Sequence, residues 1–162
     1  MITIHCETGD DVEIASDSLV GADLVGLNLH RALLDGAVLR GAFLSRADLR
    51  SAWMVEAVLD GADLRAARLP ACNASRATFV GADLRGAFLR SGVFDGANFG
   101  NANLSDADVG GANLRGAILR GADLRAVDLE HATLEGALAD EQTKWPVGFD
   151  PAAHGVIVRT SA

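Results

Sequence analysis

A period of five residues runs through most of this 162-residue chain and limits what it can fold into. Steps of five from Leu19 to Leu134 give 24 centres without insertion or deletion, and 18 of them are leucine. A period of five does not fit an α-helix, in which five residues advance about 500°. It does not fit a straight strand either, because strand side chains alternate with period two. The chain must therefore turn once in every repeat.

Each repeat then forms one short side of a coil, with two of its five side chains pointing inward. Two residues before each centre, 19 of 24 positions are alanine, and the last position of the repeat is glycine in 12 of 24. Alanine beside leucine indicates an interior too narrow for two large side chains, and glycine suits the corner that follows. Leucines stacked from coil to coil contribute about 1.5–3 kcal/mol each when buried. The period alone does not say how many sides make one coil.

The repeats Ala82–Gly86 and Ala112–Gly116 read A(D/N)LxG, a pattern that resembles the bacterial pentapeptide-repeat family. The resemblance implies an all-β fold, a right-handed quadrilateral parallel β-helix with about 20 residues per coil. On that basis residues 17–136 form a pentapeptide-repeat solenoid of about six coils. The segment Thr143–Pro151 is similar to a tail that follows many such arrays.

Both ends of an open solenoid need caps. Alternating Ile2, Ile4, Val12 and Ile14 predict that residues 1–16 form a β-hairpin that pairs with the first coil. Residues 137–162 are expected to form a short C-terminal cap and tail. In this cap a single helical turn is expected between the Asp150-Pro151 pair and Gly155. Aromatic and ring side chains are expected to close the last coil here, namely Trp145, Pro146 and Phe149.

One repeat has an undersized centre, Ala74, preceded by Cys72 in place of the usual alanine. With four sides per coil, its column neighbours are Met54 and Phe94, both longer than the average centre. Gly92 lies where it would make room for the phenyl ring. We expect the two long side chains to fill the gap above and below Ala74.

Composition and charge exclude several classes of function. The net charge of −8 and the pI near 4.8 argue against direct nucleic-acid binding, which needs a basic surface. The chain has no apolar run long enough to span a membrane and no signal-like N-terminus, and Cys6 and Cys72 do not suggest a disulfide framework. A cytoplasmic protein is expected. The carboxylates recur with the repeat, as on a solvated face, so we expect no catalytic site, no metal site, no cofactor and no enzyme activity.

Outward apolar side chains on two adjoining faces favour a non-catalytic structural or protein-interaction scaffold, with another protein or a weak homodimer as partner. Trp53 is the strongest candidate, because tryptophan is common at binding hot spots. The alternative is that β-branched residues simply suit an exposed sheet. The candidate surface comprises Val20, Val38, Val58, Val80 and Ile118 on one face, and Leu33, Trp53 and Val55 on the other.

A second hypothesis follows from the resemblance alone. Some pentapeptide-repeat proteins bind DNA gyrase or topoisomerase as DNA mimics, inhibiting the enzyme or protecting it from quinolones. Residues 17–136, however, hold 15 acidic and 12 basic residues, so the expected rod is almost neutral. No loop interrupts the repeats, whereas many gyrase-binding members have projecting loops. DNA mimicry therefore ranks second.

Overall fold

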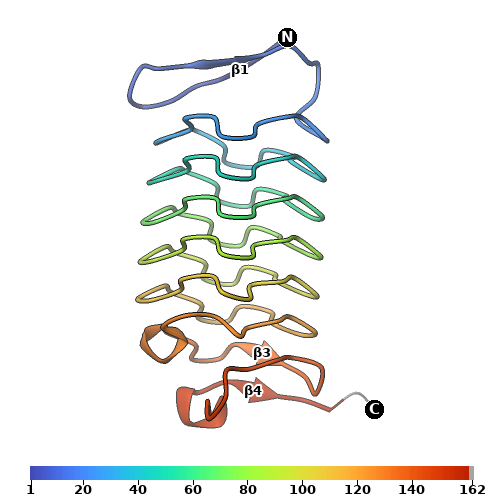
Figure 1. Cartoon of the computed structure of the whole chain (residues 1–162), viewed down its shortest axis with the longest axis vertical. Coiled ribbons are helices and arrows are strands. Elements are labelled where there is room, and N and C mark those ends of the chain that lie inside the picture. Colours follow the sequence, from blue (N-terminus) through green and yellow to red (C-terminus); the bar gives the residue numbers. More distant parts are fainter. Residues whose placement is uncertain (161–162) are drawn as a thin grey trace.

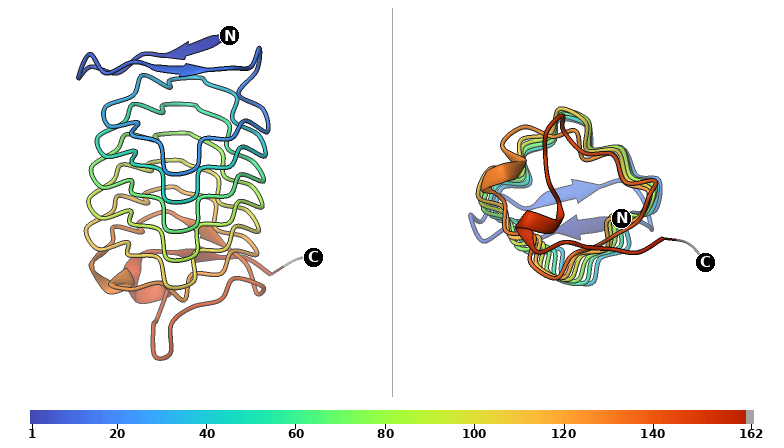
Figure 2. Two further views of the ribbon diagram at one scale, coloured as in Figure 1. Left: turned by 45° about the horizontal axis from the view of Figure 1, so that its top comes forward. Right: turned by 90° about the horizontal axis from the view of Figure 1, so that it is seen from below.

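The computed structural model describes residues 1–160 and is a rod of stacked coils (Figures 1 and 2). Parallel bridges join Asp23 to Phe43 and Phe43 to Asp63, a step of 20 residues, and the same step recurs on every face. Since each repeat has five residues, each coil has four sides. Viewed along the rod, the coils superimpose into a four-cornered outline (Figure 2). The fold is therefore a β-helix.

Each side is bonded to the coils on both sides of it. The Phe43 N–H donates to the Ala22 carbonyl at 2.9 Å, and the Leu44 N–H donates to the Asp63 carbonyl at 2.7 Å. The Ala47 N–H then donates to the Leu44 carbonyl at 3.0 Å and closes the corner. The alanine and leucine positions of most repeats are fully buried, so they form one continuous core along the rod axis.

The corners show why glycine fills only half of the final repeat positions. Corner glycines such as Gly36 adopt a left-handed backbone with φ of 66°. Ala66 and Ala71 adopt the same conformation, with φ of 54° and 55°, although it costs an L-residue about 1–2 kcal/mol. Most corner glycines have open space where a Cβ atom would lie. The left-handed backbone therefore limits the choice of residue at these corners more than the available space does. The cooperative stack of coils stabilises the corners at which a residue other than glycine adopts this strained conformation.

The N-terminal hairpin expected from the sequence forms. Strand β1 (Ile2–Ile4) pairs antiparallel with β2 (Val12–Ile14), and its inner side chains, including Ile4, are buried over the first coil. The chain after β1 also bonds to the coil, because the Leu33 N–H donates to the His5 carbonyl at 2.8 Å. The hairpin thus covers one end of the core (Figure 1).

The sequence predicted 24 equal repeats, but one side near the C-terminal end of the rod is irregular. Asp108 pairs with Val127, a step of 19 residues, and a short 3-10 helix η1 (Leu129–His131) replaces the usual side. Val127 lies where other repeats have an inward alanine, yet its side chain is 51% exposed. Valine is larger than the alanine that this interior accepts, so the backbone shifts Val127 outward while Leu129 stays buried. The prediction of an unbroken frame was wrong here.

The C-terminal segment returns to the rod and adds a strand. Strand β3 (Leu138–Ala139) pairs parallel with β4 (Ile157–Val158), and Val156 is buried beside them. Between them lies the 3-10 helix η2 (Ala152–His154), which is the expected single turn. The Asp150 carboxylate accepts the Ala152 N–H at 3.1 Å, and Gly155 ends the turn with φ of 75°.

Candidate functional site

The outward apolar residues that the sequence singled out do lie on the surface of the rod, but they do not form one surface. Leu33 and Trp53 are bridged neighbours in one column, and Val38 and Val58 are bridged neighbours in the next. Ile118 is separated from Val58 in its column by Thr78 and Asn98. The exposed members are Val20, Leu33, Val38, Trp53 and Val80, and the half-buried ones are Val55, Val58 and Ile118.

Phe43, whose side chain is 51% exposed, was not among the surface residues predicted from the sequence. Phe43 immediately precedes a centre, the same repeat position as Leu33 and Val38, so its orientation could have been read from the repeat frame. Together these three residues place large apolar groups on three consecutive sides of the rod. With the bridged neighbours on the next coil they form what we call the apolar collar: Leu33, Val38, Phe43, Trp53 and Val58.

Trp53 borders a hollow of about 250 Å³ whose lining includes Arg31, Ser51 and Asn73. The Arg31 guanidinium bonds the Glu7 carboxylate at 2.7 Å and ties the N-terminal hairpin to the first coil. Arg31, and next the Trp53 indole, hold the pKa of Glu7 below its ordinary value. Trp53 is 39% exposed in this setting, so part of its indole is covered by neighbouring residues and part is accessible.

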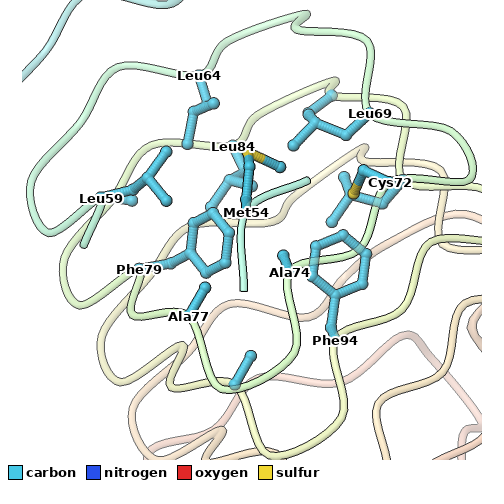
Figure 3. Close-up of a cluster of buried hydrophobic side chains, with 14 of the residues drawn as sticks. Met54, Leu59, Leu64, Leu69, Cys72, Ala74, Ala77, Phe79, Leu84 and Phe94 are labelled. Carbon is cyan, nitrogen blue, oxygen red and sulfur yellow. The ribbon is translucent and has the colours of Figure 1, made fainter. Parts of the chain in front are cut away.

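The predicted core column lies inside the rod. Met54, Cys72, Ala74 and Phe94 are all fully buried, and the Phe94 ring is directed toward the space beside Ala74 (Figure 3). A Cβ atom added to Gly92 would lie 2.5 Å from the Phe94 ring, so only glycine leaves room for it. Burial raises the pKa of the Cys72 thiol to about 12, which keeps it protonated and unreactive.

The predicted C-terminal closing residues gather below the last coil. Trp145 and Phe149 are half-buried against the core, and their rings stack with centroids 5.4 Å apart. The His154 ring of η2 also stacks on the Phe149 ring, with centroids 4.4 Å apart. Pro146 is half-buried between the two aromatic residues in the chain.

Where an aspartate or asparagine precedes a centre, its side chain in most cases bonds the backbone of its own side. The Asp63 carboxylate, for example, accepts the Arg65 N–H at 3.2 Å, and the Asn73 amide oxygen accepts the Ser75 N–H at 3.2 Å. These are local turns in which a short polar side chain satisfies a backbone donor two residues on. The same bond is made by Asp23, Asn28, Asp48, Asp63, Asn73, Asp83, Asn98, Asn103, Asp108, Asn113 and Asp123.

Trp53 occupies such a position without an acceptor oxygen. The backbone donor that it leaves, the Val55 N–H, bonds the Asp35 carboxylate of the preceding coil at 2.7 Å. A neighbouring side chain therefore compensates for the tryptophan, and the rod accommodates an outward indole without an unsatisfied backbone group.

Asp63, Asp83 and Asp123 lie in one column of outward residues, which we call the acidic column, and nearby arginines neutralise their charges. Asp63 and Asp83 pair with Arg65 and Arg85, each at 2.7 Å, and Asp123 pairs with Arg125. These arginines hold the pKa of each carboxyl below its ordinary value. The carboxylates are therefore ionised, bonded to the backbone and paired with a cation.

A cluster of possible metal ligands lies in the irregular side, where Asp128, Glu130 and His131 have ligand atoms within 4.8 Å of one another. The repeat frame gave no signal for it, because η1 brings these residues together. The Arg90 guanidinium bonds the Asp128 carboxylate at 2.5 Å and the Asp108 carboxylate at 3.1 Å. Asp128 thus has a cationic partner, and this ion pair links the irregular side to a regular coil of the rod.

Across residues 1–160, no helix has both the length and the apolar character needed to cross a membrane.

The chain is similar to solved structures of other proteins. A trypsin-treated variant of QnrB1, described as a plasmid-mediated fluoroquinolone resistance protein, has a TM-score of 0.71 and 20% identity, over 88% of this chain and 77% of that one. HetL from the cyanobacterium Nostoc sp. strain PCC 7120, a pentapeptide repeat protein involved in heterocyst differentiation regulation, is 29% identical, with a TM-score of 0.35 over 85% and 64% of the two chains. No curated protein sequence matches.

The family model for pentapeptide repeats, which spans eight copies, matches residues 18–50, 57–99 and 97–136. These segments coincide with the coils whose sides repeat every five residues and whose columns repeat every 20. The chain belongs to the pentapeptide-repeat family.

Proposed function

We propose that this protein is a non-catalytic scaffold, a right-handed β-helical rod that binds a partner protein or a second copy of itself through the apolar collar. The observation that carries the proposal is the exposure of Leu33 and Trp53 on one side of the first coils and of Phe43 two sides further on. Valines at such positions also suit an exposed sheet surface, so Val38 and Val58 add less support. Buried cysteines without a disulfide are in keeping with a cytoplasmic location.

The collar fits a binding role because the sides of the rod have little free backbone to offer. Their N–H and C=O groups bond to adjacent coils, so a partner has to be recognised through side chains. Large aromatic and aliphatic side chains dominate the energetics of such contacts. Because the collar extends over three sides, it also suits a partner that wraps partly around the rod.

Removing the collar should abolish binding without unfolding the rod. In Trp53→Ala, and in a Leu33→Ser, Phe43→Ser double variant, we expect self-association or partner affinity to fall about tenfold or more. Sedimentation velocity measures self-association, and binding to a partner captured from the source cell is measured by titration. The matched control is Val127→Ser, because Val127 is 51% exposed like Phe43 but lies in the last coils. Unchanged association in both collar variants would contradict the proposal.

Gyrase binding by DNA mimicry is the second candidate, and the acidic column of Asp63, Asp83 and Asp123 is the observation that would favour it. Pairing with arginine leaves this column little net charge. We therefore expect no inhibition of gyrase supercoiling and no relief of quinolone poisoning. An Asp→Asn variant at all three positions keeps the backbone acceptor and removes the charge, so it is the appropriate comparison. Potent inhibition by the natural chain that this variant loses would reverse the ranking.

A further inference from the structure

A hollow of about 380 Å³ lies on the side of the rod that carries the column of Asp48, Arg68, Phe88 and Asp108, which includes no collar residue. It is lined by Arg68, Pro70, Phe88, Arg90 and Asp108. Phe88 is 48% exposed, and the other outward residues of its column are polar or charged except Val127. The sequence analysis did not single out any of these residues.

The hollow has an apolar wall and one available cation. Arg68 and Phe88 are bridged neighbours in one column, and the half-buried Pro70 lies beside them. Among residues 1–160, no carboxylate oxygen lies within 4.0 Å of the Arg68 guanidinium. Asp48, its acidic neighbour in the column, pairs with Arg50 at 2.6 Å. Arg68 can therefore form an ion pair with an incoming ligand.

The other cation of the hollow is already engaged. Arg90 bonds Asp108 and Asp128, and its guanidinium would lie 2.9 Å from a Cβ atom added to Gly110. The absence of a side chain at Gly110 thus leaves room for the Arg90 guanidinium. Asp108 is paired with Arg90, so Arg68 is the lining cation that has no carboxylate within 4.0 Å among residues 1–160.

Phe43 provides an internal comparison at the same repeat position. Its exposed fraction of 51% is close to the 48% of Phe88. The column neighbours of Phe43 are Asp23 and Asp63, whereas those of Phe88 are Arg68 and Asp108, and Asp108 is paired with Arg90. A ligand that combines an apolar group with a carboxylate is therefore expected to prefer Phe88.

We propose that this hollow binds a peptide segment of a partner protein in which a single carboxylate lies next to an apolar side chain. The apolar side chain packs on Phe88 and Pro70, and the carboxylate pairs with Arg68. A nucleotide is a poorer fit, because one available arginine, an acidic rim residue and a chain of net charge −8 do not attract a polyanion. The site is separate from the collar and does not depend on it.

The smallest probe with both chemical features is 3-phenylpropanoate. Added at millimolar concentration to the ¹⁵N-labelled protein, it should shift the amide resonances of residues 68, 69 and 88–90 and leave those around Phe43 unchanged. The uncharged 3-phenylpropanamide should bind about two- to fivefold more weakly, the value of one exposed ion pair. Arg68→Gln should show the same loss, and Phe88→Ala should remove the shifts.

Arg46→Gln is the control, because Arg46 lies on a different edge of the rod and outside this hollow. Thermal unfolding of each variant checks that the rod remains intact. No shift at Phe88, equal shifts with the amide probe, or unchanged affinity in Arg68→Gln would each overturn the proposal. Tighter binding of adenosine monophosphate at the same resonances would also overturn it, in favour of a nucleotide site.

Discussion

Replacement of Phe94 by alanine should lower the free energy of unfolding by about 3–5 kcal/mol. Phe94 is fully buried, and its ring lies 6.1 Å from the ring of Phe79 and 5.7 Å from that of Phe99, centroid to centroid. Ala74, its neighbour in the column, is too small to close the space that the ring would leave (Figure 3). The cost therefore includes a cavity as well as the lost transfer free energy of the ring.

Urea unfolding followed by circular dichroism measures this loss. Phe88→Ala is the matched control, because Phe88 is an exposed phenylalanine on the same coil and should cost less than about 1 kcal/mol. In a solenoid each coil contacts mainly its neighbours, so a weakened middle coil can also reduce cooperativity. The denaturant slope should be compared for that reason. A cost below about 1 kcal/mol would mean that the adjacent centres collapse into the gap.

The interior of the rod could be predicted because one period determined it. Most five-residue steps place an alanine and a leucine inward, and the structure shows most of these positions buried. The N-terminal hairpin and the helical turn before Gly155 followed from local signals, alternation and capping residues. Each of these features depends on residues close in sequence, which a single sequence displays directly.

Other features depend on tertiary context and were missed. Val127 departs from the alanine rule, but the sequence does not show whether the interior or the backbone adjusts, and here the backbone does. The pairing of β4 with β3 involves two residues in each strand, too few to give a recognisable pattern. The carboxylates were expected to form a solvated face. The structure shows that they satisfy backbone donors, a role that asparagine fills equally well in neighbouring repeats.

Only part of the candidate surface could be predicted from the sequence, for a similar reason. Assigning residues to faces required the number of sides per coil, which came from resemblance and which the 20-residue bridges establish directly. Phe43 and Phe88 were overlooked because phenylalanine is also a core centre in this chain, at Phe79, Phe94 and Phe99. Their position in the repeat, one residue before the centre, distinguishes them. Position is thus a better guide to exposure than residue type in this fold.

Substitution of Gly92 by alanine tests whether repeat position alone decides which residue fits in the interior. It should destabilise the rod by about 1–3 kcal/mol. The new Cβ atom would lie 2.5 Å from the Phe94 ring and 3.0 Å from the Leu89 carbonyl oxygen. Alanine itself suits this repeat position, as the buried Ala87 and Ala97 show on neighbouring sides. Gly92 does not have a positive φ, so backbone strain adds nothing to the cost. The conflict therefore lies with the Phe94 ring.

A second substitution, Phe94→Leu, separates this clash from any other cause. Leucine is the usual centre and leaves room for alanine, so Gly92→Ala should cost much less in the Phe94→Leu protein than in the natural one. Urea unfolding of the four proteins in this cycle should give a coupling of about 0.5–3 kcal/mol. Additive costs would show that Gly92 is required by the backbone and not by the ring. Coupling in the expected direction would mean that the glycine, the phenylalanine and the undersized Ala74 act as one packing unit, which a repeat-by-repeat description of the rod does not contain.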